Sequence, residues 1–330
     1  TVAAQPWVRH GEVGMVGLSY PGIAQLFVAG SRPPSLAAIT PLSVYADTAT
    51  GVLSPGGLLN TGFATEWADN VLDDATAYGT GWVRQRVDEG DQVCDANQQL
   101  RLQNVDASTK ARANPFYTDD VAGPLDLREV APVVDVPVFL ASAWQDEQTG
   151  PSFGDLLGRF DSSPSVRATV YNGLHADGFA PQVLAEWAAF LDLYVARRVP
   201  AIPGIFRLLA PAFTADTFGG PVELPPDRWA DVADHAEALA RWESEPEIRV
   251  LFDNGAGGDP GLPIAAWEES ARQWPPAATA ATRFFLGSRG TLTDGRSGDG
   301  PGTAVAFHPD PAVACLLYTS PSPRDHLSYL

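Results

Sequence analysis

The stretch GMVGLSYPG, residues 14–22, places Ser19 between an apolar run and the first residues of a segment with helical spacing. Residues 13–18 form the apolar run, which is short and interrupted by glycines, and residues 22–30 carry the helical pattern. A second apolar run follows at residues 36–42 without polar alternation. Such runs are typical of strands buried on both faces of a parallel sheet. The stretch therefore predicts a strand, a sharp turn at Ser19 and a helix.

A serine at a strand-to-helix turn is the arrangement of a nucleophile elbow, in which the turn exposes the hydroxyl at the edge of the sheet. Gly17 fits this interpretation, because a small residue two positions before the serine avoids a clash across the turn. The strict G-x-S-x-G pattern is broken, since Pro21 occupies the last glycine position and Gly22 follows it. Proline is tolerated in the first helical turn, where its missing N–H would have no partner. The alternative is a structural serine that caps the helix.

A serine nucleophile needs a base within hydrogen-bond reach, and the base needs an orienting acid. In enzymes built on this elbow, the acid and then the histidine follow later strands of the sheet. Asp146 comes directly after the apolar run 136–144, and His175 comes just after the run 166–172. The sequence therefore predicts a triad of Ser19, Asp146 and His175.

Other candidates for these roles fit the pattern less well. Glu147 and Asp177 are rival acids, but Asp146 lies nearest to the end of its strand. The remaining histidines lie outside the positions expected for a base: His10, His235, His308 and His326. Metal-assisted hydrolysis by His175, Asp177 and Asp146 is a weaker interpretation, because one histidine is too few for a usual zinc site. We expect no metal and no cofactor.

Three motifs, VGMVGLSYPG, SAWQD and NGLHADG, resemble those of the CocE/NonD hydrolases, a family that includes X-Pro dipeptidyl-peptidases and bacterial cocaine esterase. The elbow of that family is usually G-x-S-Y-x-G, which accounts for the displaced glycine. Its acid follows a tryptophan or tyrosine at a strand end, as Asp146 follows Trp144 and Gln145 here. The resemblance covers roughly residues 1–310.

The resemblance implies a serine hydrolase that cleaves an ester or amide bond through an acyl-enzyme. Ser19 would attack the carbonyl carbon, His175 would move the proton, and Asp146 would hold His175 in the right tautomer. The backbone N–H of Tyr20 would be one oxyanion donor, and in this family a tyrosine in the N-terminal half of the sheet is the other. Trp67 matches a tryptophan near the acyl pocket, although it fits a core position equally well.

The resemblance also implies an α/β fold with an all-β domain after it. We expect these parts: a partial α/β-hydrolase domain over residues 1–200 with a helical cap at about 45–130, a Pro-rich linker and helix over 201–246, the start of a jelly-roll domain over 247–315, and a non-native tail over 316–330. The jelly roll would begin with strands at 247–253 and 281–293. Because several strands normally precede the elbow strand, we expect a fragment that is weakly folded and inactive alone.

Composition narrows the possible partners. The net charge is −19, Lys110 is the only lysine, and no basic run occurs. Nucleic acid is therefore not an expected partner, because phosphate binding needs clustered Lys and Arg. No apolar stretch approaches the roughly 20 residues of a membrane span, so no membrane partner is expected.

These features favour a soluble, cytoplasmic protein that acts on a small-molecule ester or a short peptide. Two non-catalytic alternatives remain, a dead hydrolase scaffold and a carbohydrate-binding module.

Overall fold

A six-stranded sheet with the order β1-β2-β3-β4-β5-β6 forms the centre of the protein. The computed structural model describes residues 2–72, 77–79, 81–102, 106–114, 116–254, 261–286 and 291–295. The strands are β1 (Val13–Leu18), β2 (Leu36–Leu42), β3 (Val138–Ala143), β4 (Val166–Tyr171), β5 (Ile248–Asn254) and β6 (Ala265–Ala271). The first five strands run parallel, and β6 pairs antiparallel with β5.

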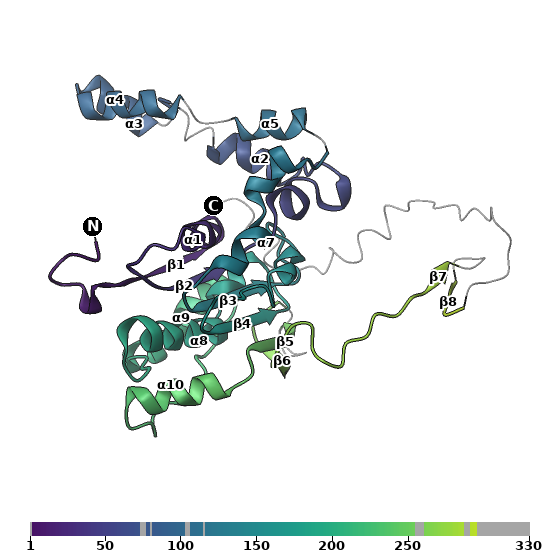
Figure 1. The fold of residues 1–330 in the computed structure, drawn as a ribbon. Helices are drawn as coiled ribbons and strands as arrows, with labels where there is room; N and C mark the ends of the chain where they lie inside the picture. The colour runs from purple at the N-terminus through teal and green to yellow at the C-terminus, as the bar shows by residue number, and fades with distance from the viewer. Residues whose placement is uncertain are drawn as a thin grey trace.

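Helices cover both faces of this sheet (Figure 1). The α-helices are α1 (Tyr20–Gly30), α2 (Ala64–Trp67), α3 (Gly81–Asp88), α4 (Gln92–Arg101), α5 (Ala107–Ala113), α6 (Asp119–Ala122), α7 (Leu127–Val130), α8 (Pro181–Leu191), α9 (Gly204–Phe218) and α10 (His235–Ser244). Short 3₁₀ and π turns link them: η1 (Arg9–Gly11), η2 (Thr48–Leu53), η3 (Pro55–Gly57), η4 (Ala68–Leu72), η6 (Gly123–Leu125), η7 (Ala131–Val133), η8 (Pro151–Asp155), η9 (His175–Phe179) and η10 (Asp192–Ala196).

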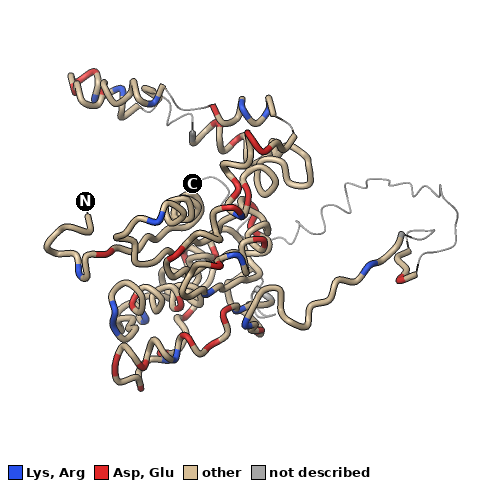
Figure 2. The backbone as a smooth tube through the Cα atoms, viewed as in Figure 1, with Lys and Arg blue, Asp and Glu red and all other residues tan. Residues whose placement is uncertain are grey.

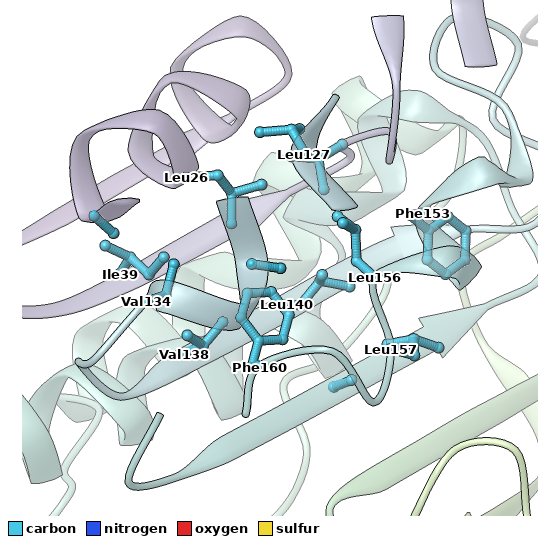
Figure 3. Close-up of a cluster of buried hydrophobic side chains, with 14 of the residues drawn as sticks. Leu26, Ile39, Leu127, Val134, Val138, Leu140, Phe153, Leu156, Leu157 and Phe160 are labelled. Carbon is cyan, nitrogen blue, oxygen red and sulfur yellow. The ribbon is translucent and has the colours of Figure 1, made fainter. Parts of the chain in front are cut away.

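The central strand β3 shows how the sequence pattern builds two cores. All six of its residues are buried, and successive side chains point to opposite faces of the sheet. Val138 and Leu140 join a cluster that includes Leu26 of α1, and Figure 3 shows these side chains together. Phe139 joins a second cluster with Phe190 of α8. The unbroken apolar run is therefore explained by helices packed on both faces.

Helices occupy the chain between β2 and β3, as the pattern over residues 45–130 predicts. Within this insertion, α3 and α4 lie farthest from the sheet (Figure 1). Its two ends meet at an antiparallel bridge between Asp47 and Asp126. Arg128 pairs with both carboxylates, at 2.7 Å from Asp126 and 3.5 Å from Asp47. The bridge and the Arg128 ion pairs thus hold together the two ends of the insertion beside the sheet.

The expected jelly-roll strand at 247–253 is a correction to the sequence interpretation. The chain there forms β5, which pairs in parallel with β4, with Ile248 opposite Ala168 and Leu251 opposite Tyr171. Ile248 and Leu251 are both buried, in the clusters on opposite faces of the sheet. The strand therefore extends the α/β sheet rather than opening a separate all-β unit. A short apolar run predicts a strand in either kind of sheet, because the sequence pattern does not show which strand it will pair with.

The segment expected as a Pro-rich linker and helix over 201–246 does contain helices, but it packs into the core. The segment contains α9 and α10, and its large side chains enter the second core instead of spanning a gap. Trp229 and Trp242 are only 7% and 1% exposed, and Trp242 contacts the ring of Phe190 at 6.2 Å between centroids. Prolines mark irregular backbone but do not by themselves indicate a linker, and here the aromatic residues between them anchor the segment.

Beyond β6 the described structure is sparse. The strands expected at 281–293 are represented by two paired two-residue strands, β7 (Phe285–Leu286) and β8 (Leu292–Thr293). The rest of the expected jelly roll and the expected tail at 316–330 lie outside the described residues.

Charge and hydropathy are spread along the described chain. Figure 2 shows acidic and basic residues scattered over the sheet and the helices, with acidic residues the more frequent. Within the described ranges, no helix is long and apolar enough to cross a membrane.

Replacing Trp242 tests whether the segment after α8 belongs to the core. Its ring lies under the Arg167 guanidinium at 4.4 Å and is almost fully buried. We expect Trp242→Ala to lower the free energy of unfolding by about 3–5 kcal/mol in urea denaturation. Trp7→Ala is the matched control, because Trp7 is 74% exposed. A Trp242→Ala protein as stable as this control would contradict the packing described.

Candidate active site

Ser19 occupies a sharp turn between β1 and α1, as its sequence context predicts. Its backbone angles are φ 65° and ψ −129°, a conformation that residues other than glycine rarely adopt. The Ser19 N–H donates to the carbonyl of Leu42 at the end of β2, at 2.8 Å. The Ser19 carbonyl accepts the N–H of Ile23 at 2.9 Å. These two bonds hold a strained residue in place, as is common at functional sites.

Two glycines allow the chain to make this turn. A Cβ atom at Gly17 would lie 2.5 Å from the Cβ of Pro21, so the residue before the turn has no room for a side chain. A Cβ atom at Gly22 would lie 2.7 Å from the carbonyl oxygen of Leu42. The displaced glycine is therefore required where α1 approaches β2, which gives the G-x-S-Y-P-G spelling a physical reason.

Gln25 fastens the turn from behind, a role that the sequence analysis missed. The side chain is fully buried, and its Oε1 accepts the N–H of Thr40 in β2 at 2.7 Å. Its Nε2 donates to the carbonyls of Pro21 at 3.1 Å and Gly17 at 3.3 Å. One amide thus joins β1, α1 and β2. The available signal was a polar residue inside an otherwise apolar helix.

Asp146 and His175 meet in a direct hydrogen bond. The distance from Nδ1 of His175 to Oδ2 of Asp146 is 2.7 Å, and the residues are 6% and 5% exposed. The other carboxylate oxygen of Asp146 accepts the N–H groups of Gln148 and Thr149, each at 2.8 Å. Because the carboxylate is fixed by its own loop, it favours a hydrogen on Nδ1 and leaves Nε2 as the acceptor.

The turn that carries His175 lies on the ends of β1 and β2. Ser43, the residue after β2, donates its hydroxyl to the carbonyl of His175 at 2.9 Å. In the same turn, a Cβ atom at Gly178 would lie 2.6 Å from Cδ1 of Leu18. Leu18 and Ser43 are both direct neighbours of the Ser19 turn, so the His175 turn is held beside it.

The structure brings Asp146 and His175 into contact, and the His175 turn lies against Leu18, the residue before Ser19. Within the described part of the chain, the Ser19 hydroxyl makes no hydrogen bond, and none to His175 is present. Hydrogen bonds of this kind are often long in free enzymes and tighten when substrate binds.

The rival acids occupy different positions around the same turn. Glu147 Oε2 accepts the main-chain N–H of His175 at 2.9 Å. Asp177 Oδ2 accepts the main-chain N–H of Leu174 at 2.9 Å. Asp146 is the carboxylate that the structure places on the imidazole ring. Asp146, the acidic residue nearest to the end of its strand, is therefore also the one that bonds to the imidazole.

The raised pKa of Tyr171 reflects burial and the negative charge near the His175 turn. It ends β4 and is fully enclosed, and burial raises the pKa of its hydroxyl well above the usual value. The nearby carboxylates of Asp177, Asp146 and Glu147 raise that pKa further. The hydroxyl therefore remains protonated, and the charge around the His175 turn is negative.

Tyr20 and Trp67 lie on the open side of the elbow. Tyr20 begins α1, so its backbone N–H has no carbonyl partner within the helix and lies at the positive end of the helix dipole. Its exposed ring contacts the half-buried ring of Trp67, with 6.4 Å between centroids. Trp67 ends α2, so the helical insertion reaches the elbow through this pair. In the described ranges, no three His, Cys, Asp or Glu side chains gather as a metal-ligand set.

Comparison with known proteins identifies the family. Residues 2–176 match the family model for X-Pro dipeptidyl-peptidases of the S15 family, a range that contains Ser19, Asp146 and His175. The chain belongs to this family. The matched range ends directly after the His175 position, so it includes the first two motifs quoted from the sequence and the third as far as Ala176.

Relatives within this group extend the comparison. The cocaine esterase of Rhodococcus sp. (strain MB1 Bresler) is 27% identical over 314 residues, which are 92% of this chain and 49% of the relative. This S15-family chain therefore spans about half the length of that curated relative. Two solved structures of a CocE/NonD family hydrolase from Staphylococcus aureus give TM-scores of 0.53 and 0.55 at 16% and 17% identity. They cover 86% and 89% of this chain and 38% and 40% of their own, and show that the α/β fold is shared.

Adding one methyl group at Gly17 tests the turn. We expect Gly17→Ala to lower the free energy of unfolding by about 1–3 kcal/mol, because the new Cβ overlaps Pro21 and the turn must open. Gly81→Ala is the matched control, since Gly81 is exposed and a Cβ there meets nothing within 4 Å. Thermal and urea unfolding measure both. Equal stability of the two variants would show that the turn is looser than described.

Proposed function

We propose that Ser19, His175 and Asp146 form the catalytic triad of a serine hydrolase that cleaves an ester or amide bond. Membership of a hydrolase family supports the reaction class. The observation that supports the triad most is the 2.7 Å bond between Asp146 and His175, held on the strand ends that also carry the Ser19 turn. A serine in a strained turn beside a base with a fixed tautomer is the arrangement that acyl transfer needs.

Each side chain has a defined role in this proposal. Nε2 of His175 takes the proton from Ser19 as its oxygen attacks the carbonyl carbon, and then gives that proton to the leaving alcohol or amine. Asp146 stays ionised and stabilises the imidazolium between these steps. Water attacks the resulting acyl-enzyme by the same route in reverse, with His175 again as the base, and releases the acid.

The oxyanion of the tetrahedral intermediate requires donors of its own. We propose the backbone N–H of Tyr20 as one donor, because it opens α1 and lacks a partner within the helix. The family resemblance implies a second donor, a tyrosine in the N-terminal half of the sheet. β1 is the edge strand of the described sheet, and Val16 in its middle is 52% exposed. We infer that the remainder of the whole protein supplies that donor, and that a missing donor reduces turnover by about 10²–10³-fold.

We propose a small ester or a short peptide as the substrate class. The rings of Tyr20 and Trp67 lie next to the elbow, and aromatic side chains suit an apolar group near the carbonyl being attacked. The names of the related peptidases and of the Rhodococcus esterase fall in the same two classes. Trp67 is in this proposal a wall of the acyl pocket rather than a core residue.

Covalent labelling tests the triad directly. A fluorophosphonate reacts with serines that a base activates, so we expect one adduct per chain, located on Ser19 by peptide mapping. Ser19→Ala should remove the adduct. Ser31→Ala is the matched control, because Ser31 is an exposed serine at the other end of α1, and it should label as the wild type does. Hydrolysis of p-nitrophenyl acetate, measured alongside, reports the oxyanion hole separately.

The outcomes distinguish the proposal from its alternatives. Labelling that survives Ser19→Ala would place the nucleophile elsewhere. A chain that is folded by circular dichroism and does not label would indicate a dead scaffold or a binding module. Rapid ester turnover by the 330-residue chain would contradict the inference that a second donor lies in the rest of the protein.

A further inference from the structure

His175 is held through its main chain as well as through its ring. It is the first residue of η9, a position at which the N–H has no carbonyl partner within the turn. The carboxylate of Glu147 accepts this N–H at 2.9 Å, and the hydroxyl of Ser43 donates to the His175 carbonyl at 2.9 Å. Both main-chain polar groups of the residue are therefore bonded to side chains from other loops.

We propose that Glu147 is a positioning residue, whose carboxylate anchors the main chain of His175 while Asp146 orients its ring. This inference rests on the proposed function, since it assigns a task within the same site. Two consecutive residues of the loop after β3 would then grip one residue of the loop after β4 at two points. Glu147 contacts neither substrate nor reacting atoms in this proposal and acts through His175.

The residues around the turn show why this anchor is needed. Leu174 precedes the turn, and its side chain offers no acceptor for the free N–H groups that usually take a capping oxygen. Asp177 accepts the N–H of Leu174, which leaves the N–H of His175 to Glu147. A bond to a carboxylate is charge-assisted, and therefore stronger than one to a neutral acceptor.

A single bond to Asp146 would leave the imidazole free to swing about it. Nε2 must reach the serine hydroxyl with small error, because a displacement of about 1 Å can cost on the order of 10²-fold in rate. A second anchor on the main chain removes that freedom. The loop that supplies both anchors is itself rigid, since the Asp146 carboxylate accepts two N–H groups of its own loop.

The exposure of the Glu147 side chain distinguishes a positioning role from a role in stability. The Glu147 side chain lies at the surface, where Gln148 Nε2 reaches its other oxygen at 3.3 Å, whereas Asp146 is buried. Shortening Glu147 removes little packing, so the protein should retain its stability. A change in the behaviour of His175 at unchanged stability is what a positioning role predicts.

Hydrogen exchange at the His175 amide measures the anchor without requiring catalysis. In Glu147→Ala we expect this amide to exchange about tenfold faster or more, because its acceptor is lost. In Glu147→Gln the side-chain carbonyl still accepts, so exchange should stay within about threefold of the wild type. Glu129→Ala, at another exposed glutamate, is the control and should leave the His175 amide unchanged. An unchanged amide in Glu147→Ala would overturn the proposal.

The rate of fluorophosphonate labelling at Ser19 then tests the consequence. We expect a fall of about tenfold in Glu147→Ala and recovery in Glu147→Gln, with the same thermal unfolding midpoint in both. An equal fall in labelling rate in Glu147→Ala and Glu147→Gln would overturn the proposal, because an acceptor for the His175 N–H would then have no effect on the rate. A wild-type chain that never labels would count against the triad, whereas the exchange result would still decide whether Glu147 anchors His175.

Discussion

The close approach of α1 to β1 and β2 is the constraint on which the site depends. Gly17 and Gly22 have no room for a Cβ, and Gln25 bonds to both strands from the helix. This packing forces Ser19 into its strained turn at the carboxyl end of β1. Because the strands are parallel, the loops after β3 and β4 emerge at the same edge, which brings Asp146 and His175 to that edge as well. Sheet topology, rather than closeness in sequence, assembles the residues.

A dense set of polar contacts then sets the orientation of His175. His175 is nearly buried, yet its ring, its N–H and its carbonyl each have a partner, in Asp146, Glu147 and Ser43. Burying these polar groups without partners would be costly. The loops after β2 and β3 supply the hydrogen-bond partners that the His175 turn needs. The same enclosure raises the pKa of Tyr171 and keeps the surroundings negative. The fixed position of His175 and the negative surroundings of its turn therefore arise from one arrangement.

The sequence could predict those parts of the site that local pattern determines. Apolar runs locate β1, β3 and β4, and residues just beyond their ends become the candidates, so Ser19, Asp146 and His175 are predicted from position alone. The pairing of strands from distant segments leaves no such local pattern. The sequence therefore does not show that β5 pairs with β4 instead of starting the expected jelly roll. The prolines of residues 201–246 predict a linker beside the helix, and they do not reveal that Trp229 and Trp242 pack into the core. Gln25 and the contact from Glu147 depend on tertiary approach, and a single sequence does not encode it visibly.

Three carboxylates surround the His175 turn, and the account assigns the acid role to Asp146. The most direct test is the rate at which a fluorophosphonate labels Ser19 in Asp146→Asn, with Asp177→Asn as the matched control. The account predicts a fall of about 10⁴-fold in Asp146→Asn, because an amide at Nδ1 favours the wrong tautomer. It predicts a small effect in Asp177→Asn, where the amide oxygen can still accept the N–H of Leu174. Equal rates in the two variants, or a collapse only in Asp177→Asn, would contradict it.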